Sequence, residues 1–230
     1  MQQETAAKIT RGSGKSRENI QKKKAAYTRN RILDAAEDVF NDRGYSQTSL
    51  NEIAQVAGMT RGAVYWHFKN KEDLFNAMCE RVREPMRVLL EETVRKKMAE
   101  DPIAQLVSAH ECFMREMVGN AHYRKVTEIL LLKCEHTVVA THILENKRQW
   151  RDYISDLLQG ALESAKRQGA LPEDLDVPMA VDVMFSSFWG MIGDWLVSPG
   201  RYPDIMAHAK RLHSAMFDLF RTSPNLKKTG

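Results

Sequence analysis

The stretch TSLNEIAQVAGMTRGAVYWHFKNK, from Thr48 to Lys71, decides the fold because it predicts two short helices joined by a tight turn. The apolar residues of the first helix recur at the spacing of one helix face, at Leu50, Ile53, Ala54 and Ala57. Ser49 and Glu52 make a capping-box start, and Gly58 suits the left-handed conformation that often follows a helix end. Thr60 is a good N-cap for a second helix from Arg61 to Phe68. Helices this short are not stable alone, so they need support from another helix.

That supporting helix is predicted from Tyr27 to Asn41. Its apolar stripe consists of Ile32, Ala35, Ala36, Val39 and Phe40. The sequence Asp42-Arg43-Gly44 ends it. Packed across the helix pair, it completes a three-helix domain over residues 27–71.

The outer face of the second short helix fits duplex DNA. Its N-terminal N–H groups suit a phosphate, Gly62 and Ala63 allow close backbone approach, and Arg61 can reach a guanine edge. Donors on Tyr65, His67 and Lys71 suit phosphate oxygens. The candidate DNA-binding residues are Thr48, Thr60, Arg61, Gly62, Ala63, Tyr65, Trp66, His67 and Lys71. The alternative is a helical hairpin with a solvated basic tip, but helix, short turn and helix is a common DNA-binding motif.

Charge is distributed unevenly along the 230 residues, whose formal net charge is +4. Residues 1–31 hold nine Lys or Arg and two acids, so the basic excess is entirely N-terminal. Residues 1–26 have few apolar anchors and are predicted to be a disordered basic arm, which either attracts phosphates or only aids solubility. No secretory signal or membrane span is evident, so we expect a cytoplasmic protein. The cysteines Cys79, Cys112 and Cys134 are expected to be buried free thiols.

Residues 72–230 read as helix throughout. A long connector starts after the N-cap Asn70 and runs to about Glu100, with a bend or a break expected at Pro85. The segment Val177 to Val197 is apolar all round, which predicts burial on every side, partly against a second subunit. With the final helix, Pro203 to Phe220, it predicts a four-helix bundle about a twofold axis in a homodimer.

Catalytic and metal-binding patterns are weak. Cys134-Glu135-His136 with His142 lacks the two ligand pairs of a usual zinc site, so a core thiol and solvated histidines are favoured. No nucleophile, paired carboxylate or glycine-rich cofactor turn stands out, and we expect no catalytic residue, metal or cofactor. An enzyme and a structural helical protein whose basic arm binds nucleic acid without sequence preference are the alternative classes.

These motifs resemble a known family. The run TRGAVYWHFKNKEDLF, with TSLNEIAQVAGM and ILDAAEDVFNDRGY before it, is similar to the DNA-binding domain of the TetR family of bacterial repressors over about Arg29 to Met78. VTEILLLKCEHT and the pairing of FSSFWGMIGDWL with a terminal helix resemble its AcrR/TtgR-like multidrug-efflux branch. The resemblance implies an all-α fold, with an N-terminal three-helix helix-turn-helix DNA-binding domain and a C-terminal helical ligand-binding and dimerisation domain.

A ligand cavity follows from the same resemblance, whereas the residues alone favour a filled core. Its candidate lining residues are Phe113, Met117, Thr127, Leu131, Phe185, Phe188, Trp189 and Ile192. Thr127 and Leu131 depart from relatives, which often carry a longer polar residue and a His there, and Trp189 stands where some relatives carry an acid. The expected function is a ligand-responsive repressor of a multidrug efflux operon that binds a pseudo-palindromic operator and is released by hydrophobic, aromatic or cationic drugs. The alternative is a TetR-type regulator of an unrelated metabolic operon that senses a small apolar metabolite.

Overall fold

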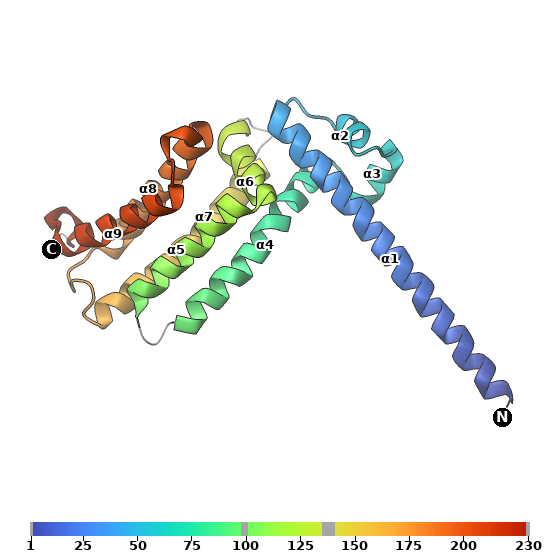
Figure 1. Ribbon diagram of the computed structural model, residues 1–230, viewed down its shortest axis with the longest axis horizontal. Coiled ribbons are helices and arrows are strands. Elements are labelled where there is room, and N and C mark those ends of the chain that lie inside the picture. The colour runs from blue at the N-terminus through green and yellow to red at the C-terminus, as the bar shows by residue number, and fades with distance from the viewer. Residues whose placement is uncertain (1, 98–100, 135–140, 229–230) are drawn as a thin grey trace. The chain divides into compact units, whose positions relative to one another are not determined.

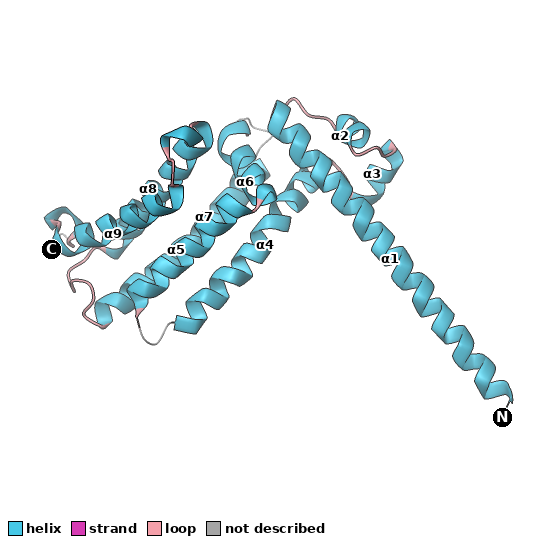
Figure 2. Ribbon diagram, in the orientation of Figure 1, coloured by secondary structure: helices cyan, strands magenta, loops and turns pink. Residues whose placement is uncertain are grey.

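A computed structural model gives the structure of the chain and describes residues 2–97, 101–134 and 141–228. Over these ranges the chain forms helices joined by loops, without a β-strand (Figure 2). The predicted all-α class is therefore confirmed. The chain divides into two compact units, Met1–Met78 and Cys79–Gly230. The division lies inside a helix, whereas the predicted domains meet at Lys71.

The first unit contains α1 (Gln2–Arg43), α2 (Leu50–Val56), α3 (Arg61–His67) and the start of α4 (Lys71–Lys97). α1 packs against α2, and α2 packs against α3 (Figure 1). The core of this unit consists of apolar side chains that are at most 2% exposed: Ile32, Leu33, Ala36, Phe40, Ile53, Val64, Phe68, Leu74, Phe75 and Met78. The predicted stripe of the supporting helix thus faces the two short helices.

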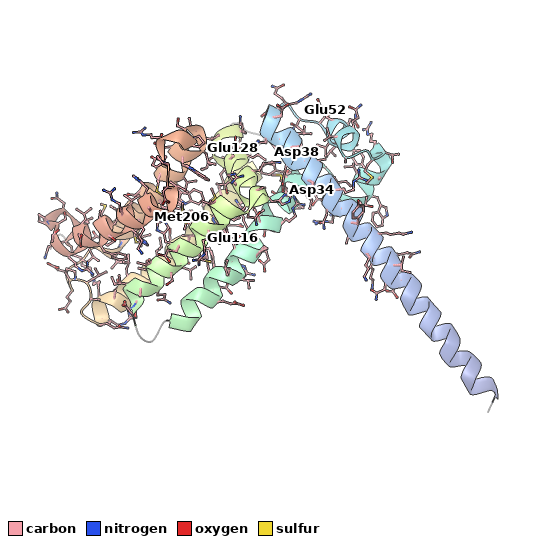
Figure 3. All side chains as sticks on the ribbon, in the orientation of Figure 1. Asp34, Asp38, Glu52, Glu116, Glu128 and Met206 are labelled. Carbon is pink, nitrogen blue, oxygen red and sulfur yellow. The ribbon has the colours of Figure 1, made fainter. Side chains whose placement is uncertain are left out.

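The turn signals in this unit form as predicted. Ser49 Oγ accepts the N–H of Glu52 at 3.3 Å, and the Glu52 carboxylate, labelled in Figure 3, accepts the N–H of Ser49 at 2.8 Å. The same carboxylate contacts Arg43 Nη1 at 2.6 Å, which ties the start of α2 to the end of α1. Gly58 has φ +64°, a conformation that a side chain would strain.

The N-terminal arm differs from the prediction. Residues 2–26 belong to α1 instead of forming a disordered arm. This segment contains many Lys, Gln, Glu and Ala residues, which favour helix, and no proline interrupts it. Extending an existing helix requires no new nucleus, so the supporting helix can continue towards the N-terminus.

The second unit contains the rest of α4, followed by α5 (Pro102–Gly119), α6 (Ala121–Glu128), the π-helical turn η1 (Ile129–Lys133), α7 (Thr141–Arg167), α8 (Val177–Val197) and α9 (Ile205–Thr222). Two short 3-10 turns, Pro199–Arg201 and Pro224–Leu226, follow α8 and α9. α5 packs against α6, α7 and α9, and α8 packs against α7 and α9 (Figure 1). Leu162, Leu175, Val177 and Phe220 are among the most buried side chains of its core.

Two expectations for this unit can be compared with the structure. The sequence predicts a bend or a break at Pro85, and α4 continues through it to Lys97 without a break; the proline is exposed and removes a single backbone hydrogen bond. α8 begins and ends where predicted, with Asp176 as its N-cap.

Of the suggested metal cluster, Glu135, His136 and the His142 side chain lie outside the described residues. In the described part of the chain, no helix has the length and apolarity to cross a membrane.

Candidate DNA interface and ligand cavities

The α3 helix is anchored on one side and open on the other. Thr60 Oγ1 accepts the N–H of Ala63 at 3.2 Å and starts the helix, as its sequence position predicts. Val64 and Phe68 are buried and hold α3 on the core. The opposite side exposes Arg61, Gly62, Tyr65 and Trp66, four of the predicted DNA-binding residues. The short helix therefore presents a continuous outer face that the fold itself does not cover.

Arg61 and Tyr65 contact each other along this face. The Arg61 guanidinium lies 5.3 Å from the centre of the Tyr65 ring, and Nη2 donates to the phenol oxygen at 3.5 Å. Both side chains are exposed and the hydrogen bond is long, so it contributes little to stability. A phosphate oxygen or a base edge can replace it without a large loss.

Trp66 and His67 complete the exposed surface of α3. Trp66 is 73% exposed, and its ring meets the His67 ring edge-on with centroids 4.5 Å apart. Partial burial, with the positive charge of Arg29 as a second cause, lowers the pKa of His67 below its usual value. His67 therefore acts near neutral pH as an uncharged donor, with a single N–H to offer.

Gly62 is open on the side of its missing side chain. A Cβ added there meets Thr60 Oγ1 at 4.0 Å, an ordinary contact, and nothing closer. The fold of the first unit therefore does not require glycine at this position. Glycine in a helix is less stable than alanine, so a role in close approach by another molecule is the better explanation.

Lys71 and Thr48, two predicted DNA contacts, have hydrogen-bond partners within the first unit. The Lys71 ammonium donates to the carbonyl oxygens of Tyr45 and Thr48, each at 2.9 Å, and to Ser46 at 3.4 Å. Its three protons therefore hold the turn before α2. Thr48 is 4% exposed and its hydroxyl donates to the Gly44 carbonyl at 2.8 Å. Both side chains therefore have partners within the first unit.

The second unit contains a space that we call the apolar cavity, of about 100 Å³. It lies among residues of α4, α5, α7, α8 and α9, and its walls are almost entirely apolar. Phe113 and Phe188, two predicted lining residues, meet edge-on in its wall with ring centroids 4.8 Å apart. The polar side chains among its described lining residues are Gln105, His110 and His213.

A second space, which we call the basic cavity, has a volume of about 390 Å³. Thr127 and Leu131, both predicted, contribute to its lining, and Phe185 and Trp189 line both cavities. The other lining residues are Val82, Arg83, Tyr123, Val126, Leu130, Lys147, Arg148, Trp150 and Arg151. Its walls therefore combine aromatic rings with four basic side chains.

Met117 and Ile192 lie apart from both linings. Each is fully buried and fills the core, so the prediction that they line a cavity is not supported by their position. Sequence periodicity shows that a residue faces inward but not whether a space or another side chain meets it. The histidines and basic residues of the linings were not predicted, because the sequence does not show that they face a space. Of these, Arg151 lies four positions after Lys147 and three after Arg148 on α7, and this spacing signals that it shares a helix face with each of them.

Each of the two units contains a region that matches a known protein family. Residues 32–78 match the model of bacterial regulatory proteins of the tetR family, and residues 101–222 match the C-terminal region of MAATS-type transcriptional repressors. The HTH-type transcriptional regulator TtgR of Pseudomonas putida is 35% identical over 90% of this chain and 98% of its own length. These matches confirm the predicted resemblance.

Solved structures add two further relatives. NalD, the secondary repressor of the MexAB-OprM multidrug efflux pump in Pseudomonas aeruginosa, has a TM-score of 0.76 and is 30% identical, covering 87% of this chain and 99% of its own. The complex of SmeT with triclosan has a TM-score of 0.71 at 26% identity, covering 86% of this chain and 93% of its own; SmeT is the repressor of the SmeDEF multidrug efflux pump of Stenotrophomonas maltophilia. The relatives are transcriptional regulators, which confirms the prediction that the chain is not an enzyme. With helix-turn-helix and C-terminal regions that both match, the chain belongs to the TetR family of bacterial regulatory proteins.

Proposed function

We propose that the chain is a homodimeric repressor that binds a pseudo-palindromic operator through α3 and leaves it when a small molecule enters the second unit. The exposed face of α3 is the observation that carries this proposal, because Gly62 and the 73% exposed Trp66 have no evident use inside the fold. Arg61 would read a base edge, and Tyr65 and His67 would contact phosphates. Two such helices on one face of B-DNA would lie about one helical turn apart, roughly 34 Å.

The dimer interface is proposed on α8 and α9. Met179 and Val197 of α8 are 47% and 64% exposed in the single chain, and Leu219 of α9 is 43% exposed. A Cβ added at Gly190 or Gly193 meets nothing within 4 Å, so this side of α8 is open to a second helix. An interface between two copies would cover these apolar side chains, and a twofold axis would match a pseudo-palindromic operator.

A ligand acts on DNA binding only through a difference in its affinity for two arrangements of the protein. The cavities of the second unit provide the binding space, and α4 is the helix through which the chain passes from the first unit to the second. If the ligand-bound arrangement changes the spacing of the two α3 helices, operator affinity falls. Linkage then requires the operator to weaken ligand binding by the same factor.

The regulated genes are proposed to encode a multidrug efflux pump. NalD and SmeT repress such pumps, and both share the fold over most of this chain. The large aromatic share of the cavity walls also suits flat drug-like molecules. A metabolic operon with an apolar effector has weaker support: the fatty acid metabolism regulator protein of Bacillus subtilis is 26% identical over 76% of this chain, below NalD at 30% over 87%.

Footprinting on the DNA that flanks the gene of this protein tests the proposal. Protection of a site with twofold symmetry is expected, and its loss on addition of an aromatic drug would identify an inducer. Arg61→Ala should weaken operator binding by about 1–3 kcal/mol and relax base preference, whereas Arg167→Ala, at an exposed position of the second unit, should not. Equal loss on operator and random duplex would exclude Arg61 from base reading.

The ligand part of the proposal has its own variant. Phe188→Ala should change the drug concentration needed for release while operator binding without drug persists, because Phe188 lies in the cavity wall. An unchanged drug titration would remove the apolar cavity from the mechanism. Selection from random duplexes distinguishes the alternatives: a structural protein that binds through its basic arm would enrich no sequence.

A further inference from the structure

The charged residues that line the basic cavity in the described chain all have one sign. Arg83, Lys147, Arg148 and Arg151 line it, and its described lining residues include no carboxylate. A lining of this kind raises the local concentration of anions and disfavours cations. The four cations differ in how far carboxylates of the protein neutralise them.

Arg83 is one of the two weakly neutralised cations. It is 8% exposed, and its nearest ion-pair partner is Glu80, whose carboxylate lies 4.0 Å from Nη1 and is itself 60% exposed. The guanidinium also lies 5.9 Å from the centre of the Trp150 ring. Buried arginines are usually matched by a carboxylate at hydrogen-bond distance, often bidentate. Glu80 is too far away to provide that match.

Lys147 is a second inward cation. Its ammonium donates to the backbone carbonyl of Leu130, which is a neutral acceptor. Burial is the largest influence on this group and lowers the pKa of Lys147 below its ordinary value. A lysine in this setting is stabilised by an anion that enters the cavity, because the anion offsets the desolvation of the ammonium.

The other two cations already have partners near the surface. Arg148 contacts Glu145 at 3.0 Å, and Arg151 contacts Asp182 at 2.7 Å. The Arg151 guanidinium also lies 4.4 Å from the centre of the Phe185 ring. These pairs leave Arg83 and Lys147, on α4 and α7, as the charges that a ligand would meet inside the cavity.

We infer that the basic cavity binds an organic anion with a flat aromatic body and one acidic group, such as an aromatic carboxylate. The acidic group would lie between the Arg83 guanidinium and the Lys147 ammonium. The aromatic body would pack against Trp150, Trp189 and Phe185, which line the same space. This inference rests on the proposed function for its consequence, since the anion would be the inducer. It replaces the expectation of cationic drugs with the opposite charge.

Three naphthalene probes of similar size but different charge test the charge preference. 2-Naphthoate, 2-naphthamide and 2-naphthylmethylammonium are titrated into the full-length protein at pH 7.5 by isothermal calorimetry, with tryptophan fluorescence as a second readout. Naphthoate should bind about tenfold or more tightly than the amide, the order expected of one charge-assisted hydrogen bond, and the ammonium should bind most weakly. No measurable naphthoate binding, or an ammonium that binds as tightly as naphthoate, overturns the inference.

Matched variants show which residues cause the preference for naphthoate. Arg83→Gln and Lys147→Met should each bring naphthoate affinity towards that of the amide, and Arg83→Lys should retain part of the preference. Arg115→Gln removes the same charge from an exposed position of α5 outside the cavity lining and should leave the ratio unchanged. Circular dichroism checks folding; if Arg83→Gln does not fold, Lys147→Met decides. Equal losses for naphthoate and amide in the cavity variants would mean that only shape is recognised.

The inference and the proposed function can fail separately. Operator binding that naphthoate does not weaken, with a clear charge preference in calorimetry, would support the anion site and contradict its role as the inducer site. Operator release by neutral or cationic drugs, without any preference for naphthoate, would support the repressor and overturn the anion site.

Discussion

The facing pair His110 and His213 predicts a specific acid sensitivity of the fold. Their Nδ1 atoms lie 3.0 Å apart, and both Nε2 atoms are buried without a hydrogen-bond partner in the described chain. One Nδ1 must donate and the other accept, so the contact requires at least one neutral ring. Phe188 and Phe217 pack on the two rings, while Glu111 and Lys210 are the charged residues beside the small space next to them.

Burial of the two imidazoles determines how the stability of the fold depends on pH. It lowers the pKa of His110 to about 3, with the neighbouring His213 as a second cause, and lowers the pKa of His213 to about 4. In the unfolded chain both titrate near the ordinary value of 6.5. The unfolded state therefore binds more protons below pH 6.5, and stability is complete above that pH and falls as the pH approaches the folded values. At pH 5 the loss is about 2 kcal/mol for each imidazole, from about 1.4 kcal/mol per pH unit.

Urea unfolding at fixed protein concentration measures this loss. Between pH 7.5 and pH 5, the free energy of unfolding of the native protein should fall by about 4 kcal/mol more than that of the double variant His110→Gln, His213→Gln. His208→Gln, at an exposed histidine of α9, should keep the full pH dependence. The same pH dependence in the double variant as in the native protein would refute the argument that these rings stay neutral when folded.

Three further predictions concern the first unit. Gly62→Ala should raise the free energy of unfolding by about 0.5 kcal/mol and yet weaken operator binding, which urea unfolding and a gel-shift titration measure together; tighter binding would mean that DNA does not approach this position. Lys71→Met should destabilise the unit by about 1–3 kcal/mol, since it leaves carbonyl oxygens such as that of Tyr45 without their ammonium partner, while the salt dependence of DNA binding stays unchanged. A smaller salt slope would show that Lys71 does contact phosphate. Ser49→Ala should lower the melting temperature through loss of a helix cap worth about 1 kcal/mol, and Ser49→Asp should restore it, whereas equal melting of all three proteins would exclude the capping role.

The helix-turn-helix region was predictable because its signals are local. The Ser49 cap, Gly58 at φ +64° and the Thr60 cap each depend on residues within a few positions along the chain. Whether a side chain is used inside the fold depends on distant residues, and the sequence does not show them. Lys71 illustrates this, because the carbonyls that it holds lie 23–26 positions earlier. Its charge predicts a phosphate contact, but nothing in the sequence indicates these carbonyl partners.

The cavities show another limit of prediction from sequence. Phe188 and Ile192 are both apolar residues of α8 four positions apart, yet one lines a space and the other fills the core. Helical periodicity cannot separate them, because both point inward. Arg83 carried no signal either, since a lone arginine on a helix with other charges is usually solvated.

The residues that local rules explain least are also the ones to which a ligand or DNA would give a use. A glycine within α3, an exposed Trp66, a buried Arg83 with its carboxylate 4.0 Å away and a histidine pair with unmet nitrogens each lower stability or solubility within the single chain. Natural proteins tend to keep such departures where function requires them. They fall in two separate groups, one on the face of α3 and one around the cavities. This distribution is what a repressor needs, because a residue that serves only DNA binding or only ligand binding can change without damage to the other.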